Sequence, residues 1–422
     1  MSEPVTMALI GAGNRGRGIF GQYALDYPYR ARFVAVVEPD AERRNAFAKA
    51  HKLPADRCFA RHEDYFAAPA ARAEAVVIAT LENQRAGPLL AALAADCHAL
   101  VEKPLANNVP ELVRLCDAAR ASKRVVSVCH QMRYTPLFAT LKGLVTSGAH
   151  GRIVSIQHSE NVSFDHQAHS YTRGLFNRST LSPLVLAKSC HDLDFLCFLT
   201  EAQPVRVASF GSLTYFRAEN APAGAPAHCL DGCPVETTCP YHVQRAYLGP
   251  DADPAYLRQM GAFEGRAELL ERLKTNRFGR CVYRCDNDVV DNQVLSILFD
   301  NGVTASFAMC GLNAVERRVT KLSMTNGELN LDASRGEIEA HTFAPRLART
   351  VRPTGPAGSH GGGDVAIMDA FTHAIRHGGG MLTNAAQALD SHLLALAAEE
   401  SRRSGETVDI RAFGARHRQA KM

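Results

Sequence analysis

The chain has 422 residues, which corresponds to two or three domains of ordinary size. Its 46% hydrophobic and 21% charged residues are typical of a globular protein, and its 12 cysteines are too few for a disulfide scaffold. The 47 basic and 43 acidic residues are spread along the chain, which excludes an obvious nucleic-acid-binding surface. No apolar stretch approaches the roughly 18 residues that span a bilayer, and the N-terminus does not fit a signal peptide. We therefore expect a cytoplasmic enzyme with neither nucleic acid nor membrane among its partners.

Apolar runs of strand length alternate with helical patterns over the first 130 residues. The runs lie at 5–10, 33–37, 75–80, 99–101 and 125–128. This alternation predicts parallel strands with helices on both faces of the sheet, because parallel strands need a crossover connection. We expect residues 1–130 to form an N-terminal Rossmann domain, an α/β domain with a doubly wound parallel sheet.

The pattern changes after about residue 150. Asn-Gly pairs at 301–302 and 326–327 lie between strand-like runs, and Asn-Gly favours the positive φ of a tight hairpin. Residues 131–422 are thus predicted to form a C-terminal α+β domain with a large open, mainly antiparallel sheet. Residues 217–280 break this pattern and contain a cysteine cluster, which indicates an insertion.

A glycine-rich motif, GAGNRG at 11–16, directly follows the first predicted strand and opens a helical run. In G-x-G-x-x-G, the glycines allow a tight turn, close approach of a pyrophosphate and close helix packing. Glu38 ends the next strand, where a carboxylate would hold ribose hydroxyls and repel a 2′-phosphate, so NAD is favoured over NADP. The predicted cofactor-binding residues here are Gly11, Gly13, Asn14, Arg15, Gly16 and Glu38.

Polar residues also follow the third predicted strand. Ligands of doubly wound sheets bind beyond the carboxyl ends of the strands. We therefore predict that Thr80, Glu82 and Gln84 line the nicotinamide half of the cofactor site.

The next strand ends in Glu102-Lys103-Pro104, and Arg133-Tyr134 follows the last strand of this unit. Together with GAGNRG, these motifs resemble the Gfo/Idh/MocA oxidoreductases of sugars and cyclitols. The resemblance covers most of the chain and implies a Rossmann domain followed by a sheet domain, usually in a homodimer or homotetramer. It also implies that Glu102, Lys103 and Arg133 contact the cofactor.

Two residues are candidates for catalysis. A lysine at position 103 can bond both the nicotinamide ribose and the reacting hydroxyl, and His191 fits the family's histidine on a following helix. Many members carry an aspartate four residues before that histidine, where this chain has Ala187. Lys188 or Asp192 is expected to take over its polar role, and both are predicted to contact the substrate.

Two further segments are predicted to bind substrate. Arg173, within the donor-rich stretch 166–174, could clamp a carboxylate, sulfonate or phosphate. His360 lies in Ser-His-Gly-Gly-Gly-Asp at 359–364, whose glycines permit close backbone approach. With GAGNRG, this second motif also resembles the NAD-dependent glycosidases of the same superfamily.

The insertion contains three thiols in fifteen residues, and Cys281 and Cys285 follow later. Four thiolates can hold a structural zinc ion, which would pin a loop of low apolar content. The spacing is not that of a familiar zinc motif, so reduced thiols and a disulfide stay open. The predicted ligands are Cys229, Cys233, Cys239 and Cys281, with Cys285 as the alternative to Cys281.

These observations predict an NAD-dependent oxidoreductase that removes hydride from a carbinol carbon of a sugar, cyclitol or glycoside. One alternative is a glycoside hydrolase that retains NAD and acts through transient oxidation and elimination. Another is a nucleotide-binding sensor without catalysis.

Overall fold

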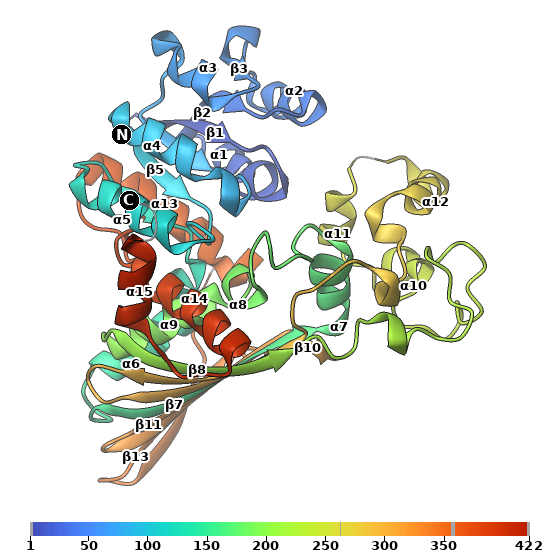
Figure 1. Cartoon of the computed structure of the whole chain (residues 1–422). Helices are drawn as coiled ribbons and strands as arrows, with labels where there is room; N and C mark the ends of the chain where they lie inside the picture. The colour runs from blue at the N-terminus through green and yellow to red at the C-terminus, as the bar shows by residue number, and fades with distance from the viewer. Residues whose placement is uncertain (1–2, 262, 356–358, 420–422) are drawn as a thin grey trace.

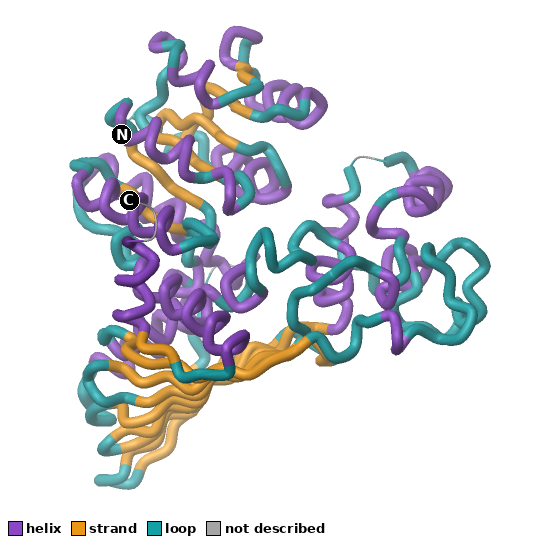
Figure 2. The backbone as a smooth tube through the Cα atoms, in the orientation of Figure 1, coloured by secondary structure: helices purple, strands orange, loops and turns teal. Residues whose placement is uncertain are grey.

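The computed structural model describes residues 3–261, 263–355 and 359–419. Two sheets organise the chain: a parallel sheet from the N-terminal part and a larger, mainly antiparallel sheet from the remainder (Figures 1 and 2). None of the helices in these described ranges is long and apolar enough to cross a membrane.

The first sheet has six parallel strands in the order β3-β2-β1-β4-β5-β6. The strands are β1 (Val5–Ile10), β2 (Ala31–Val37), β3 (Cys58–Phe59), β4 (Ala75–Ile78), β5 (His98–Val101) and β6 (Val126–Val128). Between them run α1 (Gln22–Asp26), α2 (Ala41–His51), α3 (His62–Phe66), α4 (Ala86–Ala94) and α5 (Val109–Ala121). The strand order reverses between β1 and β4, so the predicted doubly wound Rossmann sheet is confirmed, with its ligand crevice at that point.

The second sheet has nine strands in the order β14-β13-β12-β11-β7-β10-β9-β8-β15. Its strands are β7 (Ile153–Ser163), β8 (Pro204–Ser212), β9 (Asn292–Phe299), β10 (Thr304–Asn313), β11 (Arg317–Met324), β12 (Gly327–Asp332), β13 (Glu337–Thr342), β14 (Leu347–Val351) and β15 (Val408–Asp409). All neighbours are antiparallel except β7 and β10. The prediction of a mainly antiparallel sheet is confirmed.

The two Asn-Gly pairs occupy different positions relative to the hairpin turns of this sheet. Gly302 has φ +84°, as expected for a turn residue between β9 and β10. Gly327 instead begins β12 and pairs with Met324, so the turn residues are Thr325 and Asn326. A Cβ at Gly327 would lie 2.2 Å from the carbonyl oxygen of His341, so glycine is needed there for close strand packing.

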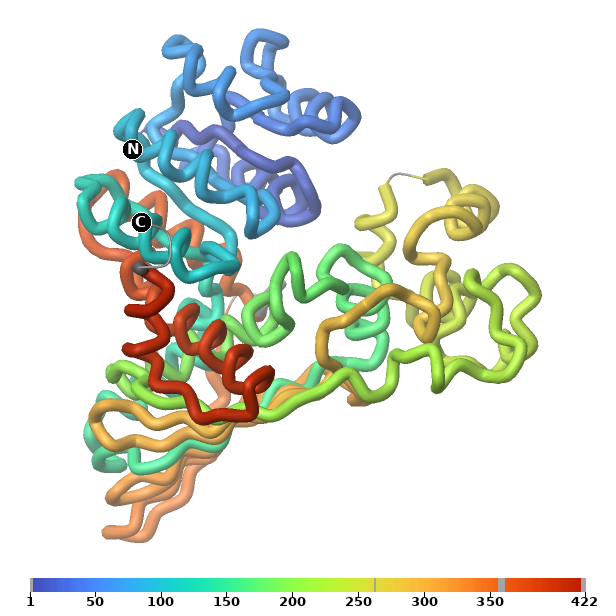
Figure 3. Tube along the Cα trace, viewed as in Figure 1, coloured from blue at the N-terminus to red at the C-terminus, as the bar shows by residue number. Residues whose placement is uncertain are grey.

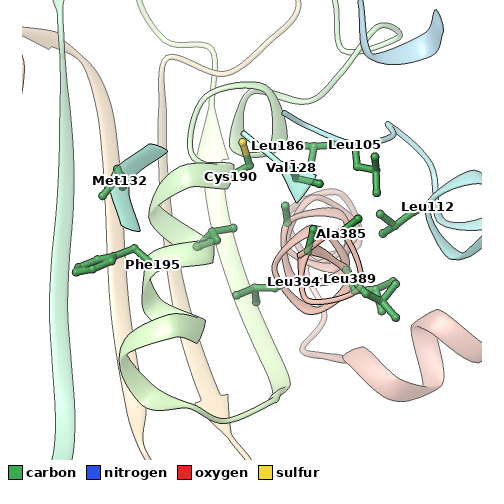
Figure 4. Close-up of a cluster of buried hydrophobic side chains, with 14 of the residues drawn as sticks. Leu105, Leu112, Val128, Met132, Leu186, Cys190, Phe195, Ala385, Leu389 and Leu394 are labelled. Atoms are coloured by element: carbon green, nitrogen blue, oxygen red, sulfur yellow. The ribbon is translucent and has the colours of Figure 1, made fainter. Parts of the chain in front are cut away.

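One face of the large sheet is covered by α6 (Pro136–Thr146), α8 (Leu184–Ala187), α9 (Cys190–Thr200), α14 (Ala388–Ser404) and α15 (Ile410–Gln419). Figure 4 shows part of the core beneath them, where α9 and α14 meet side chains from the Rossmann strands. Val128, Leu186 and Leu394 are all fully buried in this cluster. One hydrophobic core therefore continues from the Rossmann unit into the sheet unit.

The chain also returns to the Rossmann unit near its end, as the colours of Figure 3 show. Helix α13 (Gly363–His377) buries Ile367, Met368 and Phe371 in a cluster with Met7 and Phe20. The Rossmann layer is thus built from two distant stretches of sequence, whereas residues 1–130 were predicted to form it alone. That boundary stays a prediction.

Residues 213–291 leave the sheet between β8 and β9 and project from one end of it (Figure 1). Their described residues include the α-helices α10 (Val243–Leu248), α11 (Pro254–Gln259) and α12 (Gly265–Thr275). The predicted insertion at 217–280 lies inside this excursion. Small apolar clusters of its own, around Tyr241 and around Tyr247, stabilise it.

Candidate cofactor and catalytic site

The glycine-rich turn after β1 has the geometry expected of a phosphate-binding turn. Gly11 has φ +95°, and a Cβ there would lie 2.8 Å from the Ala79 carbonyl oxygen. A Cβ at Gly16 would lie 2.0 Å from the carbonyl oxygen of Gly11, whereas one at Gly13 would meet nothing within 4 Å. The turn is therefore closed by Gly11 and Gly16 and open at Gly13, where a phosphate can approach the backbone. Asn14 is exposed beside it.

Glu38 lies beside this turn and is only 6% exposed. One carboxylate oxygen accepts a hydrogen bond from the Ala12 N–H (2.7 Å), and the other accepts one from the Asp40 N–H (3.0 Å). The carboxylate is thus fixed against the turn as an acceptor for ribose hydroxyls. Its negative charge would repel a 2′-phosphate.

Arg15 is held by two carboxylates. Its Nε donates to Glu102 at 2.6 Å, and its terminal nitrogens donate to both oxygens of Asp364 at 3.0 and 2.7 Å. Although burial lowers it, Glu102 and Asp364 together raise the pKa of Arg15 above its ordinary value. Arg15 therefore joins the glycine-rich turn to the start of α13, a partnership that the sequence did not predict.

Lys103 follows β5 and points to the last residue of α8, which comes shortly before the helix that carries His191. Its Nζ donates to the Ala187 carbonyl oxygen at 2.8 Å, and its backbone N–H donates to Glu102 at 3.0 Å. The partner of the lysine is thus a backbone carbonyl, because the alanine at position 187 has no polar side chain. Glu102 thereby links Lys103 to Arg15.

His191 is in the first turn of α9 and is 5% exposed. The ring of His130 lies perpendicular to it, with 5.8 Å between the ring centroids. Burial, helped by the charges of Arg133 and Lys103, holds the pKa of His130 well below its ordinary value, so this ring is neutral. Neither of its nitrogens has a hydrogen-bond partner among the described residues.

Sequence reasoning missed His130. The available signal was its place directly beyond a Rossmann strand, the same signal that identified Thr80.

Thr80 and Glu82 present unsatisfied polar atoms beyond β4. The Thr80 hydroxyl and both carboxylate oxygens of Glu82 are buried without a hydrogen-bond partner in the described residues. Arg85, also missed from the sequence, donates to the Thr80 carbonyl at 2.8 Å and to the Pro104 carbonyl. Gln84 is exposed. Orphaned buried acceptors and hydroxyls at a strand end suit a ligand rich in hydroxyl and amide groups.

The remaining predicted cofactor residue, Arg133, forms its hydrogen bonds with other residues of the protein. Its guanidinium donates to both oxygens of Asp194 at 2.7 Å and to the Leu382 carbonyl at 2.6 Å. It therefore ties the segment after β6 to α9 and to the loop before α14. Its contact with cofactor stays a prediction.

Asp192, predicted to contact substrate, is fully buried between α9 and the large sheet. It accepts from Arg318 Nε at 2.6 Å and lies 2.8 Å from His158 Nε2. Although burial raises it, the Arg318 charge and the His158 bond hold the pKa of Asp192 below its ordinary value. Glu160, which also pairs with Arg318, lies in the same buried cluster.

Lys188 lies at the edge of this cluster with 12% of its side chain exposed. Its Nζ is 3.5 Å from Glu160 and 3.7 Å from Glu316. Glu316 also pairs with His166, which lies three residues after the end of β7. Although burial raises it, the His166 bond and the Lys188 charge lower the pKa of Glu316 to about 2.

Arg173 points into the insertion. Its side chain is 1% exposed, and it donates to the carbonyl oxygens of Arg280 and Tyr241, each at 2.7 Å. The structure thus gives it structural partners where an anion clamp was predicted. The side chain of His360, the other predicted substrate residue, lies outside the described residues.

Cys229, Cys233, Cys239 and Cys281 line one small cavity in the insertion, and all four are free thiols. Within the described ranges, no three His, Cys, Asp or Glu side chains are arranged to hold a metal ion. The Arg173 guanidinium lies 3.6 Å from the Cys229 sulfur, where its charge would oppose a cation. Burial also raises the pKa of Cys239 and Cys281, which favours thiols over the thiolates that zinc requires. The predicted zinc site therefore has no support here.

Comparison with known proteins agrees with this geometry. Residues 5–130 match the model of the Gfo/Idh/MocA oxidoreductase family, NAD-binding Rossmann fold. A Bacillus subtilis protein named as an oxidoreductase, YteT, is 20% identical over 70% of this chain and 71% of its own length. The inositol 2-dehydrogenase of Leifsonia xyli is 34% identical over 34% of this chain and 43% of its own.

Among solved structures, a levoglucosan dehydrogenase in complex with NADH and L-sorbose superposes with a TM-score of 0.70. It is 19% identical and covers 97% of this chain and 99% of its own. A likeness at this identity shows that the two chains share a fold. It places the Rossmann sheet and the large second sheet within one known architecture.

Proposed function

We propose that this chain is an NAD-dependent oxidoreductase of the Gfo/Idh/MocA family, and that it oxidises one hydroxyl of a sugar, cyclitol or glycoside. One observation carries the proposal: the Lys103 ammonium meets the Ala187 carbonyl at 2.8 Å, directly before the helix that carries His191. In this proposal, the cation of Lys103 and the imidazole of His191 act together beyond the carboxyl ends of the Rossmann strands, where ligands of such sheets bind.

The residues at this crevice fit NAD. The open side of the turn at Gly13 would receive the pyrophosphate, and Glu38 would receive the hydroxyls of one ribose. The orphaned atoms of Thr80 and Glu82 would satisfy polar groups of the nicotinamide half. Bound NAD would supply the acceptor for the hydride that leaves the carbinol carbon.

The protein's own part is to bind the substrate hydroxyl and manage its proton. In our proposal, Lys103 donates a hydrogen bond to the reacting oxygen and its charge stabilises the alkoxide as the O–H proton leaves. His191 accepts that proton, while the C–H bond breaks with its electron pair leaving as hydride. His130 stays neutral behind His191 and adds no charge that would oppose protonation.

The large sheet supports a further part of the proposal, a homodimer or homotetramer. On its outer face, Phe210 of β8 and Val294 of β9 pair across the two strands and are 66 and 49% exposed. Apolar side chains gathered on one sheet face are typical of a surface that another subunit covers.

Replacing Lys103 by methionine tests the catalytic assignment. We expect turnover of sugars and inositols with NAD to fall by about 10²–10⁴-fold, while the NADH dissociation constant measured by fluorescence stays within a few-fold. Lys142→Met is the matched control, because Lys142 is also largely buried but pairs with Glu201 and the Phe198 carbonyl. Retained turnover in Lys103→Met would refute the role of the lysine.

One observation favours a second candidate, the glycosidase that retains NAD. The aspartate that many members of this family carry four residues before the histidine is replaced by Ala187 in this chain. Mass and absorbance of cofactor released on denaturing the purified protein separate the two candidates. Stoichiometric NAD, with glycoside cleavage and no NADH accumulation, would favour the glycosidase, and an empty site would favour the dehydrogenase.

A further inference from the structure

Two predicted site residues lie at matching positions beyond neighbouring Rossmann strands. Ile78 of β4 pairs with Val101 of β5 in the parallel register, and Thr80 and Lys103 each come two residues later. Among the described residues, the last backbone hydrogen bond between the two segments runs from the Glu102 N–H to the Ile78 carbonyl oxygen at 2.8 Å. Side chains must therefore fix the position of Thr80 relative to Lys103.

Arg85, directly before α4, makes this connection through backbone carbonyl groups. Its Nε and one terminal nitrogen donate to the Thr80 carbonyl oxygen at 3.1 and 2.8 Å. The other terminal nitrogen donates to the carbonyl oxygen of Pro104, the residue that directly follows Lys103. Because a guanidinium group is planar and rigid, it holds the two carbonyl groups at a fixed separation.

The charge of Arg85 is not matched by an ion pair. Its side chain is 5% exposed, and among the described residues its hydrogen bonds all go to carbonyl oxygens. Burial lowers the pKa of Arg85 from its ordinary value, and the charges of Glu82 and Glu102 offset only part of this effect. A buried guanidinium without an ion pair costs stability, so its place between two segments of the site indicates a role in their geometry.

The segment that carries Lys103 is held on its other sides by different elements. The Lys103 N–H donates to the Glu102 carboxylate at 3.0 Å, and the Leu105 N–H donates to His392 Nε2 of α14 at 2.9 Å. Neither of these bonds reaches the segment after β4. Among the side chains of the described residues, Arg85 is thus the one whose hydrogen bonds join the lysine segment to the cofactor-binding segment after β4.

We propose that Arg85 is a positioning residue, which couples the cofactor-binding segment at Thr80 to the segment that carries Lys103. This inference rests on the proposed function and adds a residue to it. When NAD orders the segment of Thr80 and Glu82, the rigid guanidinium would pass that ordering to Pro104. The neighbouring Lys103 ammonium would then be placed against the substrate hydroxyl in the cofactor-loaded protein.

Arg85→Met tests the effect on turnover, because it removes the guanidinium and keeps an unbranched side chain. The assay uses the sugar or inositol that reduces NAD fastest with the wild-type protein. We expect kcat to fall about 10–100-fold, since a catalytic group displaced by about 1 Å can lose about 10²-fold in rate. KM and the NADH dissociation constant should stay within about threefold, because Lys103 and the side chains that bind the cofactor are all retained.

A control variant and a rescue separate positioning from a loss of folded protein. Arg57→Met is the matched control, because Arg57 also donates to a backbone carbonyl of the Rossmann unit, that of Ala70, but precedes the edge strand β3. Its kcat should equal that of the wild type. In Arg85→Ala, guanidinium chloride far below denaturing concentrations should restore part of kcat, whereas sodium chloride should not. Unchanged kcat in Arg85→Met, or a loss that guanidinium does not restore, would overturn the inference.

Amide hydrogen exchange, measured by mass spectrometry with and without NADH, tests the coupling without any substrate. In the wild type and in Arg57→Met, NADH should slow exchange in residues 79–84 and in residues 103–107. In Arg85→Met, it should still slow exchange in 79–84 but no longer in 103–107. Protection of both segments in all three proteins would refute the coupling.

The same experiment distinguishes a failure of this inference from a failure of the proposed function. If no sugar or inositol reduces NAD, the proposed oxidation is contradicted, yet a loss of protection confined to 103–107 of Arg85→Met would leave the coupling standing. If sugars are oxidised and protection is the same in all three proteins, only the coupling fails. If NADH slows exchange in neither segment of the wild type, both fail.

Discussion

The bond between Arg15 and Asp364 gives the sharpest test of how the glycine-rich turn is held. Asp364 is 4% exposed and binds Arg15 through both carboxylate oxygens, across 349 positions of sequence. Removing one partner of a buried ion pair costs about 3–5 kcal/mol. In Asp364→Asn the amide oxygen still accepts one N–H, and Glu102 still pairs with Arg15. We therefore expect the free energy of unfolding to fall by about 2 kcal/mol.

A second aspartate on the same helix is the control. Asp369 pairs with Arg30, but the two side chains are 39% and 38% exposed. It also accepts from the Tyr23 hydroxyl at 2.6 Å, a bond that the amide oxygen of an asparagine can keep. An exposed pair of this kind contributes about 0.5 kcal/mol, so Asp369→Asn should be nearly neutral. Both variants conserve size and lie on α13, so they differ mainly in the burial of the pair.

The assay is urea unfolding followed by circular dichroism. A chain with two sheets need not unfold in one step, so the relevant transition is the one that added NAD moves to higher urea. In Asp364→Asn its midpoint should fall, and NADH should bind more weakly because the turn is less firmly held. Equal destabilisation by the two variants, or none by Asp364→Asn, would refute the reasoning.

Three further predictions concern single side chains. Gly16→Ala should lower the free energy of unfolding by about 3 kcal/mol or more, because the added Cβ would lie 2.0 Å from a backbone oxygen. Gly13→Ala should fold normally and only weaken NADH binding. Thermal unfolding checks the first expectation, and fluorescence titration with NADH checks the second. Arg173→Met should leave two buried carbonyl groups without donors and lower the free energy of unfolding by about 2–3 kcal/mol. Limited proteolysis should then cleave the insertion of this variant while the Rossmann unit stays resistant. His392 accepts from the Leu105 N–H at 2.9 Å, and burial lowers its pKa from 6.5 to about 3, so only the unfolded chain gains this proton between those values. The stabilisation from the neutral His392 ring is therefore complete above pH 6.5, and below that pH the free energy of unfolding falls by about 1.4 kcal/mol per pH unit. His392→Gln should flatten this pH dependence, measured as urea midpoints between pH 8 and pH 5.

Features that depend on neighbouring residues could be predicted from the sequence. The glycines at 11 and 16 are needed because of contacts within one turn and with the adjacent strand, and their spacing carries that information. The alternation of strands and helices likewise fixes a parallel sheet, because each crossover is local. Thr80 follows from the rule that a ligand lies beyond strand ends, and Lys103 from the Glu-Lys-Pro motif and the family resemblance that it carries.

The roles of residues on α9 could not be predicted in this way. The helix is buried on nearly all sides, so its polar side chains meet different neighbours. Successive positions on a helix point about 100° apart. Asp192 consequently meets Arg318 from the sheet, and Asp194 meets Arg133 from the Rossmann side. Spacing placed both near His191, but only the packing of three distant elements determines what each one contacts.

Arg173 shows why an arginine without a nearby acid was misleading. In the sequence it looks like a ligand for anions, yet in the structure it donates to backbone carbonyls. Arg245, Arg277 and Arg284 do the same within the insertion, each toward a carbonyl at 2.6 to 2.8 Å. Irregular backbone leaves carbonyl groups that no ladder or helix satisfies, and each buried one needs a donor. Where an insertion has little regular structure, its arginines are therefore better read first as donors to the backbone, and as substrate ligands only when their N–H groups reach an open site.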